Sequence, residues 1–378
     1  MSCDVKIVSC PDYEAKTAKA ALEAVLEPFD FLDNIKPGMK IAIKANMVAK
    51  AKPEEAAVTN PVLVTELCRL LINRGAEVTV GDSPGGLFDP PWLNSIYSGT
   101  GMKSVLETGA KLNTDFEVRD ISFPEAKTAK HFPYTAWLLK HDMVINFAKL
   151  KTHALTGMTC AVKNLFGTIA GTRKAEFHYM YPKTSDFCSM LVDLNEFTKP
   201  SMTIVDAVLC MEGNGPTKGN PRHMGALLAA KTSYAADLLC AHLIGIKNEN
   251  AATVAASIKR GKCPDSWEKL NIIGDPEPFI INDFDKLPAP PLVTFETNPI
   301  FEYLIKQFWA PAPNVSTDDC IGCGKCAEVC PMSAAKITDK KARIKRTKCI
   351  RCFCCQEFCP KGAITVKRPL IPRLVTKI

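Results

Sequence analysis

The sequence predicts an α/β protein with a mainly parallel sheet and helices on both faces, followed by a small C-terminal domain of α+β character. Two observations support this prediction. Up to about residue 280, short runs rich in β-branched residues alternate with longer helical stretches, which is the pattern of strand–helix–strand units. Beyond it, nine of the 17 cysteines fall between Cys320 and Cys359, so the last part of the chain is a separate unit.

Six short apolar runs are predicted to be strands. They lie at residues 5–8, 40–44, 77–81, 142–147, 202–205 and 270–273. Most of them are apolar enough to be buried on both faces, as strands inside a parallel sheet are.

Five segments between or after these strands are predicted to be helices, at residues 14–26, 61–74, 156–170, 186–197 and 234–246. The second is the best marked, because Asn60 and Pro61 form a cap followed by proline in the first turn, and Gly75 stops the helix. The third contains Lys163 within an apolar stretch, where a lysine either extends to solvent or is buried with a partner.

The composition is that of an ordinary globular protein, with 47% hydrophobic and 23% charged residues in a chain of 378. This excludes disordered, collagen-like and coiled-coil chains. Every apolar stretch is interrupted before about 18 residues, so we expect no membrane span. An acidic residue, Asp4, stands where a signal peptide needs a basic one, and we therefore expect a cytoplasmic protein.

Prolines mark an expected domain boundary near residue 312. They cluster at positions 288, 290, 291, 299, 311 and 313, which is the composition of a linker. We expect an α/β domain over residues 1–311, with its linker at about 283–315, and a second domain over residues 312–378.

The second domain repeats a cysteine motif, C-x2-C-x2-C-x3-C-P, that begins at Cys320 and again at Cys349. Three thiolates within seven residues converge on one iron–sulfur cluster, and the fourth, before proline, is directed into the other cluster. A zinc ribbon would separate two C-x2-C pairs by a long spacer, so zinc fits poorly. The motif resembles that of bacterial two-cluster ferredoxins, which implies a ferredoxin-like α+β iron–sulfur domain that transfers single electrons.

The crossed pattern assigns ligands to two [4Fe-4S] clusters. The first set is Cys320, Cys323, Cys326 and Cys359, and the second is Cys349, Cys352, Cys355 and Cys330. Cys354 is a ninth cysteine, and only the spacing favours Cys355 over it. The eight cysteines before residue 300 are expected to be small buried hydrophobes, because a reducing cytosol disfavours disulfides. Short strands are expected near residues 335–338 and 362–366.

Residues 316–378 are basic, with 14 Lys and Arg against 5 Asp and Glu, whereas the rest of the chain has 33 against 35. Lys325, Lys348, Arg351 and Lys361 lie in or beside the cysteine motifs. They either favour the reduced clusters, or form a solvated face or a docking surface for an acidic electron donor. We expect no nucleic-acid partner, because counter-charge for an anionic cofactor is the simpler explanation.

Four predicted strands end in polar residues and glycines, at residues 44–46, 81–86, 149–153 and 206–215. Parallel sheets bind ligands at this edge. Lys149, Lys151 and His153 alternate, so in an extended strand they share one face and suit an anionic substrate. Ordinary turns explain any single end, but four ends together predict a shared site.

The predicted site contains nine residues of the α/β domain. The candidate catalytic residues are Lys151, His153 and Lys163. The candidate substrate-binding residues are Lys44, Asn46, Asp82, Lys149, Asn164 and Asp206. Lysines outnumber carboxylates in this set, so we expect a pocket that favours anions.

Five segments together resemble the family called domain of unknown function 362, which is often joined to a ferredoxin-like module. They are IKAN at 43–46, GDSP at 81–84, NFAKLKTH at 146–153, AVKNLFG at 161–167 and MEGNGP at 211–216. The resemblance runs from about residue 5 to 280. It implies the same domain layout and supports the choice of site residues, but it implies no substrate, because the family has no assigned reaction.

A shorter resemblance is to lactate racemase-like proteins. It consists of HALTG at residues 153–157 followed by Lys163, and a comparable lysine in those proteins carries a nickel-pincer nicotinic cofactor. This chain lacks the glycine pair before that lysine and the proline-glycine after it. We therefore do not expect that cofactor on Lys163.

Two functions stay open. The first is a ferredoxin-coupled oxidoreductase, which exchanges electrons with a soluble donor or acceptor protein and acts on a small anionic metabolite. The second is a non-catalytic electron carrier or metabolite-binding protein whose α/β domain docks a partner enzyme. No G-x-G-x-x-G follows a predicted strand, so no flavin or nicotinamide site is predicted between the clusters and the substrate.

Overall fold

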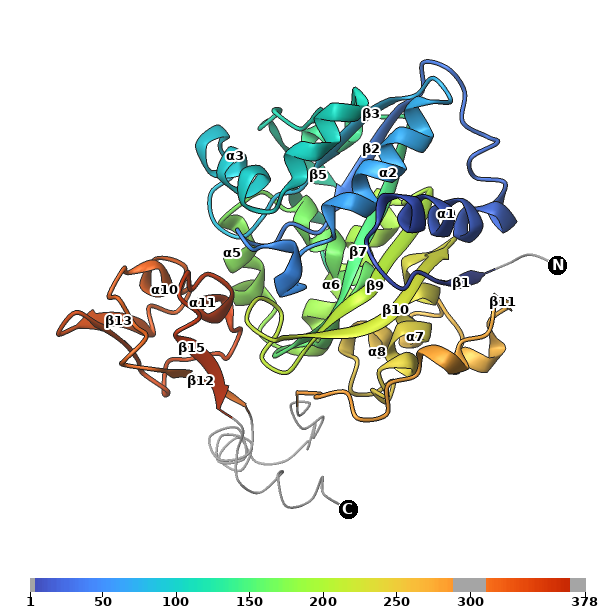
Figure 1. Cartoon of the computed structure of the whole chain (residues 1–378). Helices are drawn as coiled ribbons and strands as arrows, with labels where there is room; N and C mark the ends of the chain where they lie inside the picture. Colours follow the sequence, from blue (N-terminus) through green and yellow to red (C-terminus); the bar gives the residue numbers. More distant parts are fainter. Residues whose placement is uncertain (1–3, 288–310, 368–378) are drawn as a thin grey trace.

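A nine-stranded sheet forms the centre of the larger domain (Figure 1). The structure is a computed structural model, and it describes residues 4–287 and 311–367. From one edge to the other the strands are β11 (Ile272–Ile273), β1 (Val5–Ser9), β10 (Asn220–Ala230), β9 (Met202–Glu212), β7 (Met143–His153), β2 (Lys40–Ala45), β3 (Glu77–Gly81) and β4 (Lys111–Leu112), and β8 (Gly157–Thr159) pairs with β7. A separate hairpin joins β5 (Val118–Ser122) to β6 (His131–Thr135).

The sheet is mainly parallel, as predicted. β7 is parallel to β2 and β9, β2 to β3, β3 to β4, and β1 to β11. β10 is antiparallel to β1 and β9, and β8 is antiparallel to β7. β10 was not predicted from the sequence, because its buried half follows Gly225 as an Ala- and Leu-rich run with a weak strand preference. Pairing with two neighbouring strands overrides that preference.

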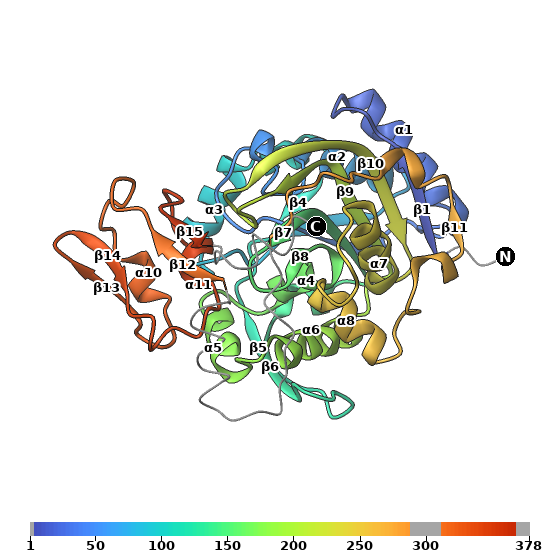
Figure 2. The same ribbon diagram turned by 90° about the horizontal axis from the view of Figure 1, so that it is seen from below.

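Helices cover both faces of this sheet, as Figure 2 shows from below. One face packs against α1 (Ala15–Leu26), α2 (Pro61–Ile72) and α3 (Pro90–Gly99). The other packs against α4 (Ala161–Asn164), α6 (Thr184–Thr198), α7 (Ser233–Leu243) and α8 (Ala252–Lys259), with α5 (Arg173–Met180) beside them. Both faces are covered because apolar side chains alternate along β2. Ile41 and Ile43 pack in the core on the first face, and Ala42 packs in the core on the other face.

The prediction of one helix over residues 156–170 was wrong. The segment forms β8, then α4, then a 3₁₀ turn over Leu165–Thr168. Gly157 has a φ of 77°, which breaks a helix at its start. Asp237 of α7 then accepts hydrogen bonds from the backbone N–H groups of Ala161 and Val162, at 2.6 and 3.3 Å, and so fixes where α4 begins.

The C-terminal module has two small sheets and two short helices. β12 (Ala312–Val315) pairs with β15 (Ile364–Lys367), and β13 (Ala335–Thr338) pairs with β14 (Lys341–Ile344). The helices are α10 (Lys325–Glu328) and α11 (Cys354–Glu357). Most of the predicted proline-rich linker, residues 288–310, lies outside the described residues.

α11 packs the module against the loops at the carboxyl ends of β7 and β9. The Gln356 side-chain amide donates to the Asn214 carbonyl at 3.3 Å and to the Asn214 side-chain oxygen at 3.1 Å. The same Asn214 oxygen accepts the backbone N–H of Val366 at 3.1 Å. The cysteine-rich helix is therefore held at the edge of the sheet where the site was predicted.

Candidate functional site

The floor of the site is a buried polar network that joins β2, β3 and α4. The ammonium of Lys44 lies 2.8 Å from a carboxylate oxygen of Asp82, and both side chains are almost fully buried. Lys44 also donates to the side-chain oxygen of Asn164 at 3.1 Å. Asn164 in turn donates to the Lys44 carbonyl at 3.1 Å and to the Asn146 side-chain oxygen at 2.8 Å. The network leaves these groups few alternative positions, so the floor is pre-organised.

Gly167 allows this network to form, which gives a first prediction. A Cβ at position 167 would lie 2.2 Å from an Asp82 oxygen and 2.8 Å from the Lys44 ammonium nitrogen. We expect Gly167→Ala to displace the ion pair and destabilise the protein by about 1–3 kcal/mol. Denaturation followed by circular dichroism measures this loss. Gly261→Ala is a comparison in open space, since no atom lies within 4 Å of its Cβ, although its positive φ adds a backbone cost of its own. Equal losses in the two variants would contradict the close-approach argument.

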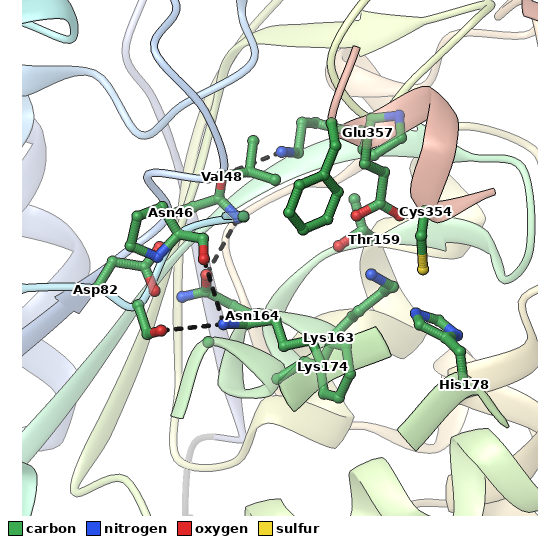
Figure 3. A pocket seen from close by; sticks show the side chains of 18 residues that line it. Asn46, Val48, Asp82, Thr159, Lys163, Asn164, Lys174, His178, Cys354 and Glu357 are labelled. Atoms are coloured by element: carbon green, nitrogen blue, oxygen red, sulfur yellow. Dashed lines mark hydrogen bonds between the residues drawn. The ribbon is translucent and has the colours of Figure 1, made fainter. Parts of the chain in front are cut away.

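A cavity of about 60 Å³ opens above this floor. The structure brings five predicted site residues to its lining, namely Asn46, Asp82, Lys151, Lys163 and Asn164. Figure 3 shows several of them around one space, together with side chains of α5 and α11. The carboxyl ends of β2, β3 and β7 are thus neighbours, as the site prediction required.

Lys151 and Lys163 present two ammonium groups to this cavity. Lys151 donates to the Asn46 side-chain oxygen at 3.0 Å and to the Ala57 carbonyl at 2.8 Å. Lys163 is 91% buried, its nitrogen lies 5.7 Å from the centre of the Phe166 ring, and it has no hydrogen bond or ion pair within residues 4–287 and 311–367. The Glu357 carboxylate attracts it from beyond ion-pair distance, which leaves the N–H donors of Lys163 available to an anion in the cavity.

Four further titratable side chains line the cavity and were not predicted from the sequence. They are Lys174, His178, Cys354 and Glu357. Lys174 and His178 lie on α5, which was not predicted, and Cys354 and Glu357 come from the cysteine-rich module. Lys174 and His178 could have been found only by predicting α5. Cys354 and Glu357 could have been found only by predicting how the module packs against the α/β domain.

His153 connects the two domains. Its Nδ1 accepts the backbone N–H of Leu155 at 3.0 Å, so the proton is on Nε2, which donates to the Glu357 carboxylate at 3.0 Å. Burial and the nearby Lys163 lower the pKa of His153 to about 4. Burial by itself would raise the pKa of Glu357. The positive charge of Lys163 and the hydrogen bond from His153 have a larger effect in the opposite direction, so the pKa of Glu357 lies well below its usual range. At neutral pH a neutral imidazole therefore faces a carboxylate.

Two more lysines are poised to change charge near neutral pH. Burial lowers the pKa of Lys151 to about 7, and the positive charge of Lys163 adds to this effect. Burial also lowers the pKa of Lys174 to about 7, against the attraction of Asp82. The Lys174 ammonium donates to the Ser83 hydroxyl at 3.0 Å and to the Ile169 carbonyl. The cavity thus holds groups that can give up protons at neutral pH.

Lys149 and Asp206 were predicted to bind substrate, but the structure places them away from the cavity. Their ammonium and carboxylate groups lie 2.8 Å apart and are fully buried. Tyr13 donates to Asp206 at 2.8 Å and accepts from Lys149 at 3.0 Å, while the backbone N–H of Asn60 donates to Asp206 at 2.9 Å. Lys149 lies on the same face of β7 as Lys151. However, Asp206 is its register partner on the adjacent strand β9, and the two side chains form an ion pair with each other. The pair joins β7, β9 and the starts of α1 and α2.

The cysteines of the module line two separate cavities. The first is lined by Cys320, Cys323, Cys326 and Cys359. The second is lined by Cys330, Cys349, Cys352 and Cys355, together with Cys354. Backbone N–H groups point at these sulfurs, since Ala342 donates to Cys320 at 3.3 Å and Ala334 donates to Cys330 at 3.2 Å. Both groups offer the four thiolates that a 4Fe-4S cluster needs.

Comparison with known proteins identifies both parts of the chain. The family model described as domain of unknown function (DUF362) matches residues 41–242, and the model described as 4Fe-4S dicluster domain matches residues 312–360. The C-terminal module is thus a 4Fe-4S electron-transfer domain. No helix within the described parts of the chain is long and apolar enough to cross a membrane.

Two individual proteins are similar to this chain. The thylakoid-associated protein sll1697 of Synechocystis sp. is 29% identical over 291 residues, which cover 75% of this chain and 87% of that protein. The lactate racemase apoprotein from Thermoanaerobacterium thermosaccharolyticum has been solved and matches with a TM-score of 0.38 at 11% identity, over 62% of this chain and 54% of that chain. This chain thus spans about half of that solved protein.

Proposed function

Since the chain belongs to the family described as domain of unknown function (DUF362) and carries a 4Fe-4S dicluster domain, we propose that it is an iron–sulfur oxidoreductase. Its substrate is a small anion bound in the cavity between the α/β domain and α11. The observation that supports this most is the position of Lys163. Its side chain is 91% buried, its ammonium group has no hydrogen-bond acceptor within the described residues, and it lines a cavity that the cluster-binding helix also lines.

The size of the cavity limits the substrate. A water molecule needs at least about 10–15 Å³ of such space, so about 60 Å³ holds roughly four to six atoms of that size. Small carboxylates and oxyanions have this size, and Lys151, Lys163 and Lys174 supply the charge that such anions need. The amide groups of Asn46 and Asn164 are the candidate groups for orienting the anion.

The thiolates of the module fit two [4Fe-4S] clusters with crossed ligands. Cys330 lines the same cavity as Cys349, Cys352 and Cys355, and Cys359 lines the other. When bound, the clusters supply single electrons at low potential. Anaerobically prepared protein is therefore expected to contain about eight iron and eight labile sulfide per chain. Four iron per chain in elemental analysis would contradict the second cluster.

For a 2-oxo carboxylate, the redox step adds two electrons and two protons to the C=O bond. The electrons are delivered singly by a low-potential donor protein, which is oxidised, and the protons come from solvent. One proton forms the C–H bond and the other the O–H bond of the product alcohol, and no group leaves. In this step Lys163 and Lys151 hold the anion and offset its charge. Lys151 and Lys174, whose pKa values burial lowers to about 7, supply protons and regain them from water. His153 stays neutral and holds Glu357, so that α11 remains against the cavity.

Anion affinity is expected to fall as the pH rises through about 7. Lys151 is protonated below its pKa of about 7 and neutral above it, so at high pH the cavity loses positive charge. Calorimetric titration of the whole protein between pH 6 and pH 8.5 measures the change. An affinity that stays constant over this range would contradict the involvement of Lys151.

The experiment that tests the function is a screen without oxygen. The fully reduced protein is mixed with formate, acetate, pyruvate, nitrite and phosphate, and cluster absorbance is followed in the presence of an electron donor. Sustained reoxidation by one of them supports the oxidoreductase. Binding of an anion without reoxidation would instead favour the alternative, a metabolite-binding electron carrier.

The free thiols and clusters are suited to a reducing compartment, for which we propose the cytoplasm.

A further inference from the structure

The outer hairpin of the C-terminal module, formed by β13 and β14, concentrates positive charge. Between residues 336 and 348 the chain has seven Lys and Arg residues and one acidic residue, Asp339. Six of the seven basic side chains are exposed and Lys341 is half-buried. In both Figures 1 and 2 the hairpin lies at the end of the module that points away from the α/β domain. We call it the basic hairpin.

Strand pairing brings like charges face to face in the basic hairpin. Lys336 lies directly opposite Arg343 in the antiparallel register. Such a pair destabilises a hairpin by about 0.2–1 kcal/mol. Asp339 offsets only part of this charge, because it lies 3.7 Å from Arg343 and both side chains are exposed. A hairpin that served only the fold would gain stability from opposite charges at these positions, so its charge indicates a binding surface.

The inner side of the basic hairpin contacts the first cysteine set. The backbone N–H of Ala342 donates to the Cys320 sulfur at 3.3 Å. Ile337 of β13 lines the same cavity as Cys323, which is itself exposed. Ile321 and Ile337 are 59% and 37% exposed, so apolar side chains lie on the surface beside a cluster ligand. An apolar centre within a charged surface is typical of a protein–protein contact.

We propose that the basic hairpin, together with Ile321, is the docking surface for an acidic one-electron donor protein. The positive charge attracts the donor, and the apolar residues place it next to the first cysteine set. One electron leaves the donor, which is oxidised, and reduces the 4Fe-4S domain, with no proton or bond change. An anionic membrane would also bind positive charge, but it gives no reason for the charge to lie over a cluster ligand. The inference concerns reduction of the clusters and does not depend on the substrate of the cavity.

The test measures how fast the whole protein is reduced. Oxidised protein is mixed without oxygen with a reduced acidic [2Fe-2S] ferredoxin, at low and at high salt. The variant is Lys336→Glu/Arg343→Glu, and its matched control is Lys16→Glu/Lys19→Glu, which makes the same change of charge on exposed positions of α1. We expect the hairpin variant to be reduced at least about tenfold more slowly at low salt, with the difference shrinking at high salt, and the control to behave as wild type.

Two further measurements separate docking from damage. Methyl viologen radical, a small cation, is expected to reduce the hairpin variant no more slowly than wild type, which shows that the clusters are intact. Lys336→Gln/Arg343→Gln relieves the repulsion and is expected to be slowed to an intermediate degree. Equal rates for the hairpin variant and its control would overturn the proposal. So would an unchanged rate combined with lost binding to phosphatidylserine vesicles, which would assign the hairpin to a membrane surface.

Discussion

Asp206→Ala is expected to destabilise the protein by about 3–5 kcal/mol, because it leaves the Lys149 ammonium buried without its partner. Both groups are fully buried and lie 2.8 Å apart. Tyr13 and the backbone N–H of Asn60 lose their acceptor as well. The measurement is chemical denaturation of the holoprotein followed by far-ultraviolet circular dichroism. Anion affinity is expected to stay unchanged in the folded variant, because neither residue lines the cavity.

Two comparisons make the Asp206 prediction specific. Asp265→Ala breaks an exposed ion pair with Lys269, in which the two atoms are only 2.6 Å apart, and it is expected to cost within about 0.5 kcal/mol. Lys149→Met/Asp206→Leu removes both buried charges and is expected to recover most of the loss. If Asp206→Ala costs no more than Asp265→Ala, burial does not govern the strength of this pair.

Lys163→Met is expected to weaken anion binding by about 10- to 100-fold while changing the stability of the fold little. The first effect follows because a charge-assisted hydrogen bond contributes about 1.5–3 kcal/mol. The second follows because a thioether of similar length removes both the desolvation cost of this largely buried side chain and its attraction to Glu357, and the two effects oppose each other. A substitution that affects binding far more than stability is typical of a side chain kept for function.

Titration calorimetry and denaturation on the same preparation measure both effects. Lys259→Met on α8 is the control, because that side chain is exposed and is expected to change neither quantity. A Lys163→Met protein that is destabilised and binds anions as well as wild type would show that Lys163 serves the fold.

Much of the fold followed from local sequence signals. The strands around β2 and β3 were predicted at nearly their observed bounds, because buried parallel strands are short, apolar and bounded by turns. The module followed from cysteine spacing, which geometry restricts tightly. Residues 156–170 were predicted wrongly, because the carboxylate of Asp237, 76 residues from Ala161 in sequence, sets the start of α4.

Only those residues of the candidate site that lie near predicted strand ends could be predicted from the sequence. Asn46 and Asp82 directly follow β2 and β3, and Lys151 lies near the end of β7, so the shared carboxyl edge of the sheet brings them together. Lys149 differs because a partner on the adjacent strand neutralises it, and sequence alone does not show which acid a buried lysine meets. Glu357 could not be predicted for another reason, because its position in the cavity depends on how the C-terminal module packs against the α/β domain.

The central claim is that a small anion binds in the cavity beside the cluster-binding helix, and electron paramagnetic resonance tests it most directly. The reduced whole protein is titrated with formate, acetate, pyruvate, nitrite and phosphate, in wild type and in Lys163→Met. We expect at least one anion to change the spectrum of the reduced clusters in wild type, and the same anion to have no effect at that concentration in Lys163→Met. Spectra that no anion alters in wild type, or that change equally in both proteins, would contradict a cavity site next to the clusters.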